Sequence, residues 1–316
     1  MPNQDCPSDT RNPTPPVGIS ADLHAGKKHT RPVRICYDTR PSHIRITITQ
    51  MEPAIKMALR IARQGSDYLK AHFERQEPNS GDRDSQRKQL ERVEQSIYDN
   101  FQEQLEKAYK DHQIAPLGQA DAGDAERSWH IFPLLGGENF LRGIPEFAVA
   151  LMQKRNNRTE NLLLINPVTG EEYSASRGHG AALNSRRIRT SEIRHTADAA
   201  LVSNLLAQSK DSENALLWGE MAAVLSSETE QFRTSGCTAL DIARVAAGHL
   251  DAAVIFRPTP EDLALGVTLA MESGALTGDF SGNPHTGGSK QLVVANPKLF
   301  RELLKTLHPF RARLPR

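Results

Sequence analysis

The chain has 316 residues and balances 39 Lys and Arg against 38 Asp and Glu, which gives a formal net charge of +1. A chain of this length can bury a substantial core, and so small a charge excludes a whole-chain attraction to nucleic acid or to an anionic membrane. The three cysteines, Cys6, Cys36 and Cys237, lack framework spacing, so we expect a reducing, cytoplasmic compartment rather than a disulfide scaffold. No apolar run approaches the roughly 18 residues of a transmembrane helix, and we expect no membrane contact.

Residues 1–50 are rich in Pro, Arg, Asp and Thr and contain no apolar run of the length that a signal peptide needs. Their composition predicts a disordered tail. Two interpretations stay open, because the resemblance described below begins at Met51. Either Met51 is the true start of the protein, or the residues before it are an extension with a docking or regulatory role.

Two helices are predicted after this segment. The first covers residues 53–73, where apolar side chains recur at helical spacing and Pro53 suits the first turn. Residues 76–88 are polar and contain Gly and Pro, which predicts a loop. The second helix continues to about residue 109, and its apolar face is formed by Val93, Ile97, Phe101 and Leu105.

The hydrophobic period then changes to that of strands. Strands are predicted over residues 147–152, 162–165 and 173–176. The turns between them, at 156–158 and 166–170, contain Asn, Pro and Gly, which favours an antiparallel meander.

The remaining elements alternate between helix and strand. They are a helix over 239–247 closed by Gly248, a strand over 252–256, a helix over 263–271, a strand over 292–295 and a final helix after Asn296-Pro297. Helices that alternate with sheets predict an α/β (α+β layered) sandwich. We expect an N-terminal half, 51–190, and a C-terminal half, 191–316, packed as one compact unit.

The segment from Trp129 to Phe140 resembles the signature of the inositol monophosphatase family. The family pattern is W-x-x-D-P-L-D-G-T-x-N-F, and this chain has W-H-I-F-P-L-L-G-G-E-N-F. Residues 171–184, 232–243 and 262–274 resemble further motifs of the family, and their wording is most similar to its bacterial SuhB branch. The resemblance implies the αβαβα sandwich of the inositol monophosphatase and fructose-1,6-bisphosphatase superfamily.

The resemblance also identifies changed metal-binding positions. The two aspartates of the signature fall on Phe132 and Leu135, and the family's Glu-Glu pair falls on Leu117 and Gly118. Asp262 alone keeps a carboxylate at a family ligand position. Family members hydrolyse phosphate monoesters with Mg²⁺, which requires hard oxygen ligands in near-octahedral geometry. We therefore expect a degenerate site and no metal cofactor.

Acidic residues near the lost ligands raise the question of a rebuilt site. Glu138 and Glu261 are close in sequence, but Glu138 is three residues from Leu135, a shift of up to roughly 10 Å along an extended chain. The family's T-x-x-D element, which supports the nucleophilic water, falls on Glu91 and Glu94. We expect none of these acids to replace the missing ligands.

Asp262 has two interpretations. Thr259 and Pro260 predict an N-cap and a first helical residue, so Asp262 is explained as an acid in the first turn of a helix. It is also the relict metal position that the resemblance implies. Both interpretations stay open.

Other features are weighed in the same way. The backbone N–H groups of Gly136 and Gly137 offer a binding position for an anion, although a Gly-Gly turn is common. His179 lies between two glycines, a context that predicts a turn residue rather than a catalytic base. Cys237 lies next to the apolar residues of a predicted helix, so we expect its side chain to be buried as a small hydrophobic group.

The densest basic segment contains Arg186, Arg187, Arg189 and Arg194. Phosphate or carboxylate pairing with RNA or an acidic partner is one interpretation, and a solvated hairpin end is the other.

The function implied by the resemblance is that of a non-catalytic binding or regulatory factor in ribosomal RNA transcription antitermination. The expected partners are RNA polymerase, Nus factors and a second copy of the chain in a homodimer, with a weak RNA contact. The alternative is a Mg²⁺-dependent phosphatase acting on inositol 1-phosphate or a related sugar phosphate.

Overall fold

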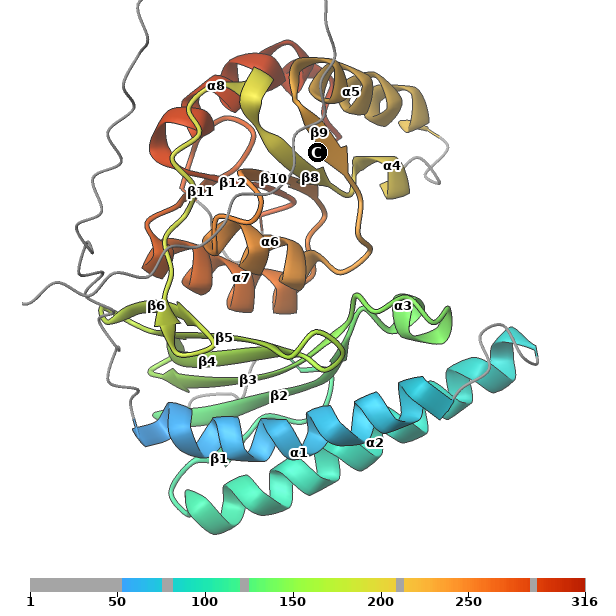
Figure 1. The fold of residues 1–316 in the computed structure, drawn as a ribbon, viewed down its shortest axis with the longest axis vertical. Coiled ribbons are helices and arrows are strands. Elements are labelled where there is room, and N and C mark those ends of the chain that lie inside the picture. Colours follow the sequence, from blue (N-terminus) through green and yellow to red (C-terminus); the bar gives the residue numbers. More distant parts are fainter. Residues whose placement is uncertain (1–52, 76–81, 120–124, 209–212, 285–288, 316) are drawn as a thin grey trace, which may run out of the picture. The chain divides into compact units, whose positions relative to one another are not determined.

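The computed structural model describes residues 53–75, 82–119, 125–208, 213–284 and 289–315. The predicted tail and the alternative start at Met51 lie outside these ranges. The described residues belong to one compact unit and form five layers in the order helices, sheet, helices, sheet, helices (Figure 1). The layered α/β sandwich predicted from the sequence is therefore confirmed.

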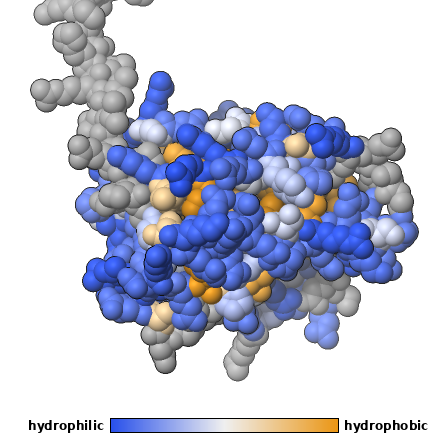
Figure 2. All heavy atoms as spheres, turned by 90° about the horizontal axis from the view of Figure 1, so that it is seen from below, coloured by the Kyte–Doolittle hydropathy of each residue, from blue (hydrophilic) through white to orange (hydrophobic). Residues whose placement is uncertain are grey.

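The first helical layer consists of α1 (Pro53–Arg75) and α2 (Arg83–Ala108). Both helices pack against the first sheet, and the buried cluster between them includes Leu69, Phe101 and Trp129. Seen from the side of these helices, the described surface is mainly hydrophilic, with scattered apolar residues (Figure 2). This outer face therefore carries the solvated side chains that the sequence predicts.

The start of α2 corrects one prediction. Asp82 caps the helix by accepting hydrogen bonds from the amides of Asp84 and Ser85. The loop predicted over 76–88 is therefore wrong at residues 83–88. Its polar residues form the solvated first turns of a helix, which carry no apolar stripe to reveal them.

The first sheet, called sheet A, has its described strands in sequence order. β1 runs parallel to β2, and the other neighbouring pairs are antiparallel, which confirms the predicted meander. The strands are longer than predicted, because polar residues at their ends also pair. Their bounds are β1 (Gln113–Ile114), β2 (Arg127–Leu135), β3 (Ala148–Arg155), β4 (Arg158–Asn166), β5 (Glu171–Ser176), β6 (Gly180–Leu183) and β7 (Arg186–Arg187), with the short α3 (Gly137–Leu141) after β2.

The middle layer consists of α6 (Thr238–Ala246) and α7 (Pro260–Ser273), which lie between the two sheets. The helices approach closely at Gly266, where a Cβ atom would lie 2.5 Å from the Cδ1 atom of Ile242. Both helices were predicted, and α7 begins at Pro260 after its N-cap Thr259, as these two residues predicted. Gly248 follows α6 with φ +72°, as expected for a glycine that closes a helix.

The second sheet has the order β11-β12-β10-β8-β9 and is covered on its outer side by α5 and α8. The strand after α6 and the final strand and helix were predicted. α5 was not, because its sequence is apolar on most sides and shows no helical stripe. The bounds are β8 (Ala200–Ser203), α4 (Leu205–Gln208), α5 (Ala215–Glu228), β9 (Gln231–Arg233), β10 (Ala252–Phe256), β11 (Leu276–Gly278), β12 (Gln291–Ala295) and α8 (Pro297–Leu307), with the short 3₁₀ helices η1 (Thr196–Asp198) and η2 (His308–Arg313).

Within the described ranges, none of the helices combines the length and the apolar content that crossing a bilayer requires.

Candidate functional site

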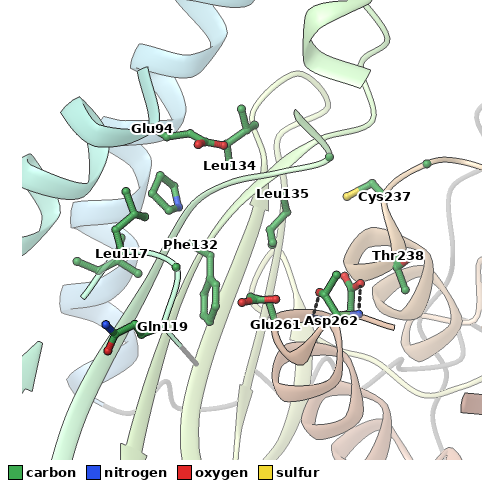
Figure 3. A pocket seen from close by; sticks show the side chains of 16 residues that line it. Glu94, Leu117, Gln119, Phe132, Leu134, Leu135, Cys237, Thr238, Glu261 and Asp262 are labelled. Carbon is green, nitrogen blue, oxygen red and sulfur yellow. Dashed lines mark hydrogen bonds between the residues drawn. The ribbon is translucent and has the colours of Figure 1, made fainter. Parts of the chain in front are cut away.

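A pocket of about 470 Å³ lies where α2, the loop after β1, the end of β2 and the first turns of α6 and α7 meet (Figure 3). It brings together Leu117, Gly118, Phe132, Leu135 and Asp262, the positions that the resemblance assigns to family ligands. The lining residues that carry the argument are Leu117, Phe132, Leu135, Glu94, Glu261 and Asp262.

The end of β2 forms the corner of the pocket. Gly136 has φ +83°, and a Cβ atom there would lie 2.8 Å from the carbonyl oxygen of Glu146, so only glycine fits. Asn139 donates through its side-chain amide to the carbonyls of Glu146 at 2.8 Å and Ser235 at 2.9 Å. The retained residues of the signature therefore hold the turn and join it to the loop before α6.

The position of the family's threonine is filled differently. It is Gly137 here, and a Cβ atom on it would lie 2.9 Å from the Cδ2 atom of Leu90. A side chain at this position requires Leu90 to move. The space beside the turn is thus already taken by an apolar side chain of α2.

The three changed ligand positions now belong to apolar clusters. Phe132 is 7% exposed and packs in the cluster between sheet A and the middle helices, and Leu135 packs against the same cluster. Leu117 packs against the cluster under α1 and α2. Figure 3 shows the ring of Phe132 between Leu117 on one side and Glu261 on the other. Apolar side chains therefore line the pocket at the positions that the resemblance assigns to family carboxylates.

Asp262 is held in a capping box. Its amide donates to Oγ1 of Thr259 at 3.1 Å, and its Oδ2 atom accepts from the amide of Thr259 at 3.2 Å. The side chain is buried, and burial raises the pKa of its carboxyl above the usual range. The predicted role of Asp262 as a helix-start acid is confirmed, and this role accounts for the residue without a metal.

Two further acids line the pocket. Glu261 precedes Asp262, and Glu94 projects from α2 beside Leu134 on the opposite side of the pocket (Figure 3). Burial, followed by the charge of Glu91, raises the pKa of Glu94. The family's T-x-x-D element fell on Glu91 and Glu94, and of these two residues Glu94 lines the pocket.

Glu138 does not reach the pocket. It is exposed and lies 3.9 Å from the guanidinium groups of Arg87 and Arg142. Of the two acids that the sequence placed near the lost ligands, only Glu261 therefore lines the pocket.

The residues of this pocket do not fit a magnesium ion. Mg²⁺ takes hard oxygen ligands at about 2.0–2.1 Å in octahedral geometry. The described residues contain no group of three or more His, Cys, Asp and Glu side chains arranged to hold a metal ion. Glu94 and Asp262 lie on different walls, and the carboxylate of Asp262 is engaged in the helix cap.

The other predicted features lie near the pocket or away from it. Gly136 lines the pocket, and the predicted anion contact of Gly136 and Gly137 stays a prediction. Cys237 is buried as predicted, but it is the N-cap residue of α6, and burial raises the pKa of its thiol to about 12. His179 lies in the turn after β5, where its amide donates to the carbonyl of Ser176. The basic residues Arg186, Arg187, Arg189 and Arg194 are exposed at and after β7.

A buried acid on α6 was not foreseen. Asp241 is 4% exposed and accepts from the hydroxyl of Ser235 at 2.6 Å, while its Oδ1 atom has no hydrogen-bond partner. Burial raises the pKa of Asp241 to about 7. It borders a second, smaller pocket beside the ion pair of Arg244 and Glu146, whose atoms lie 3.1 Å apart. An Asp in an apolar helix was the only signal for it.

The sequence model of the inositol monophosphatase family matches residues 50–311. The chain belongs to the inositol monophosphatase family. The Nus factor SuhB of Pseudomonas aeruginosa is 33% identical to it over 263 residues, which cover 82% of this chain and 97% of that protein. The Nus factor SuhB of Escherichia coli K12 is 28% identical over 259 residues, which cover 81% and 96%. The predicted resemblance to the family and to its SuhB members is confirmed.

Solved structures agree with the family fold. The extragenic suppressor protein SuhB of Bartonella henselae matches with a TM-score of 0.67 at 21% identity, covering 81% of this chain and 100% of that chain. Thermotoga maritima IMPase matches with a TM-score of 0.69 at 23% identity, covering 83% and 99%. The αβαβα arrangement of the superfamily is therefore present here.

Proposed function

We propose that this chain is a non-catalytic member of the inositol monophosphatase family that acts as a binding or regulatory factor in ribosomal RNA transcription antitermination. One observation carries the non-catalytic part. The family ligand positions meet in one pocket, and three of them hold Leu117, Phe132 and Leu135. The relatives that are Nus factors support the regulatory part.

The charge of the pocket supports the same proposal. None of the sixteen described residues that line it is Lys, Arg or His, and three are acidic. Family catalysis relies on metal ions to neutralise the phosphate and activate a water. Without such ions, a phosphate monoester entering this pocket meets like charge and apolar side chains. The pocket therefore disfavours the substrates of the family.

The proposed partners are RNA polymerase and other Nus factors, and the proposed assembly is a homodimer in the cytoplasm. These proposals follow the names of the relatives, and fold alone does not establish them. A role of this kind needs a stable surface rather than a catalytic centre. It is compatible with a metal site whose positions have become part of the core.

Transcription in vitro tests the proposal. A template with a ribosomal RNA leader and a terminator is transcribed by purified polymerase and Nus factors, with and without this protein. We expect the wild type and Asp262→Ala to raise read-through equally. An absence of any effect, together with failure to recover polymerase or Nus factors by affinity purification from extract, would remove the antitermination role.

The alternative is a Mg²⁺-dependent phosphatase, and the three acids Glu94, Glu261 and Asp262 around one pocket are the observation in its favour. Release of phosphate from inositol 1-phosphate with excess Mg²⁺ tests it. We expect no turnover above that of Asp262→Ala. Turnover in the wild type that Asp262→Ala and Glu261→Gln both abolish would replace the non-catalytic proposal.

A further inference from the structure

Three arginines lie side by side at one end of sheet A. Arg127 on β2 is directly opposite Arg155 on β3, and Arg155 is directly opposite Arg158 on β4. Residues directly opposite one another on neighbouring strands point to the same face of the sheet. Like charges in such positions destabilise a sheet, so this row, here called the arginine row, opposes folding unless an anion neutralises it.

A rigid turn holds the row in place. Asn156 and Asn157 join β3 to β4 with φ +48° and +59°, which suits a two-residue turn in which both residues are left-handed. The amide of Asn156 donates to the carbonyl of Glu126 at 2.7 Å, so the turn is also tied to β2. The guanidinium groups start from fixed backbone positions, which lowers the ordering cost of binding.

The acids around the row lie too far from its guanidinium groups to form short charge-assisted hydrogen bonds with them. Glu126 lies 4.0 Å from Arg127 and 3.8 Å from Arg155, and Glu160 lies 3.8 Å from Arg155. Charge-assisted hydrogen bonds are about 2.7–2.9 Å long. All of these side chains are between 39% and 68% exposed, so the pairs are weak and open to solvent.

A fourth arginine extends the positive surface. Arg177 follows β5, and its amide donates to the carbonyl of Glu160. With Arg155, Arg158, Asn156 and Glu160 it lines an open hollow of about 560 Å³. Neither Arg158 nor Arg177 forms an ion pair with another described residue. Four guanidinium groups therefore face two carboxylates at this end of the sheet.

Half-buried aromatic side chains flank the row. His112 and Tyr109 stack with ring centroids 5.0 Å apart. Both rings also pack on Trp129, with centroids 5.2 Å away for Tyr109 and 6.4 Å for His112, and Trp129 lies two residues from Arg127 on the same face of β2. A positive track beside aromatic rings is the combination that binds single-stranded polynucleotides, whereas an acidic peptide has no need of the rings.

We propose that the arginine row and Arg177 bind the phosphodiester backbone of single-stranded RNA. The row crosses three neighbouring strands, which are about 4.8 Å apart, and so offers a line of donors to a linear polyanion. The proposed function supports the choice of RNA over single-stranded DNA, but the site rests on the geometry alone. It also differs from the earlier candidate, the segment that contains Arg186 and Arg187.

Fluorescence anisotropy with the full chain and a labelled single-stranded RNA tests the site. The variant is Arg155→Gln/Arg158→Gln, and the matched control is Arg186→Gln/Arg187→Gln, which changes the net charge equally. We expect the variant to bind RNA about tenfold more weakly and to reduce the slope of log K against log salt concentration by about 1.4. We expect the control to change neither the affinity nor the slope. Glu160→Gln removes a negative charge from the hollow and is expected to bind about twofold more tightly.

Thermal unfolding separates binding from folding. Because the row places like charges opposite one another, Arg155→Gln/Arg158→Gln is expected to unfold at the same temperature as the wild type or higher. Equal losses in variant and control, or no loss in either, would overturn the site. So would a variant that keeps RNA binding but loses binding of a poly-glutamate peptide. Tighter binding of a DNA strand of the same sequence removes only the choice of RNA, and RNA binding without antitermination contradicts only the proposed function.

Discussion

The two ends of β2 have opposite chemistry. At its carboxyl end, Phe132 and Leu135 line a pocket with three acids and, among the described residues, no basic group. At its amino end, Arg127 begins the row that continues through Arg155 and Arg158. One end repels an anion and the other attracts it.

Under the proposed non-catalytic function, this difference separates the residues that hold the fold from those that would hold a metal. The signature residues that remain, such as Gly136 and Asn139, hold the corner between sheet A and the loop before α6. Those that changed are positions that the family resemblance assigns to metal ligands. The corner serves the packing of the sandwich, and this need does not depend on catalysis.

The largest effect is expected when a carboxylate is introduced at one of the apolar positions of the pocket. Phe132→Asp removes a buried ring and places a charge in an apolar cluster, so we expect the free energy of unfolding to fall by about 3–5 kcal/mol. Phe132→Leu is the control, with an expected loss of about 1 kcal/mol. Urea unfolding measures both. Equal stability of Phe132→Asp and the wild type would show that the position still tolerates a carboxylate.

The corner that supports the pocket end contains a pH-dependent group. Asp241 has its pKa raised by burial to about 7, so the folded state holds a proton that the unfolded state releases above its ordinary pKa. The protonated carboxyl of Asp241 makes its full contribution to the free energy of unfolding below about pH 4. That free energy falls by roughly 2–4 kcal/mol as the pH rises from there through about 7.

Asp241→Asn is expected to remove that loss. Urea unfolding of the wild type and the variant at pH 5 and pH 8 gives the comparison, because other groups contribute equally to both proteins. The variant should gain stability over the wild type as the pH rises. A constant difference between the two proteins would mean that Asp241 is ionised throughout.

Two glycine substitutions test whether the corner is needed for packing. Gly136→Ala meets both a left-handed backbone and the carbonyl of Glu146 at 2.8 Å, so we expect a loss of about 3 kcal/mol. Gly178→Ala has a similar φ of +75° with nothing within 4 Å, and about 1 kcal/mol is expected. Similar losses in the two variants would indicate strain alone and no packing role for the corner.

The smallest expected effect concerns the helix cap. Thr259→Ala and Asp262→Ala each remove one half of the capping box and are expected to cost about 1 kcal/mol. The double variant should cost less than the sum, since each half depends on the other. Additive losses in a double-mutant cycle would show that Asp262 has a role apart from the cap.

The sequence predicted the layers, the meander and the cap of α7, because hydrophobic period, turn residues and capping residues are local signals. It also placed Leu117, Phe132 and Leu135 at one site through the family resemblance. It missed α5, whose apolar residues are not confined to one face, and the burial of Asp241. The arginine row escaped as well, because Arg127 and Arg155 meet only through strand register, which no local pattern reveals.

Metal binding tests the central claim most directly. Mn²⁺, used in place of Mg²⁺, is titrated into the purified protein and its free concentration is followed by electron paramagnetic resonance. We expect no saturable site at submillimolar concentration and the same curve for Asp262→Asn, because Glu94 and Asp262 lie on different walls of the pocket and the carboxylate of Asp262 is engaged in the helix cap. Stoichiometric binding that Asp262→Asn abolishes would contradict the account.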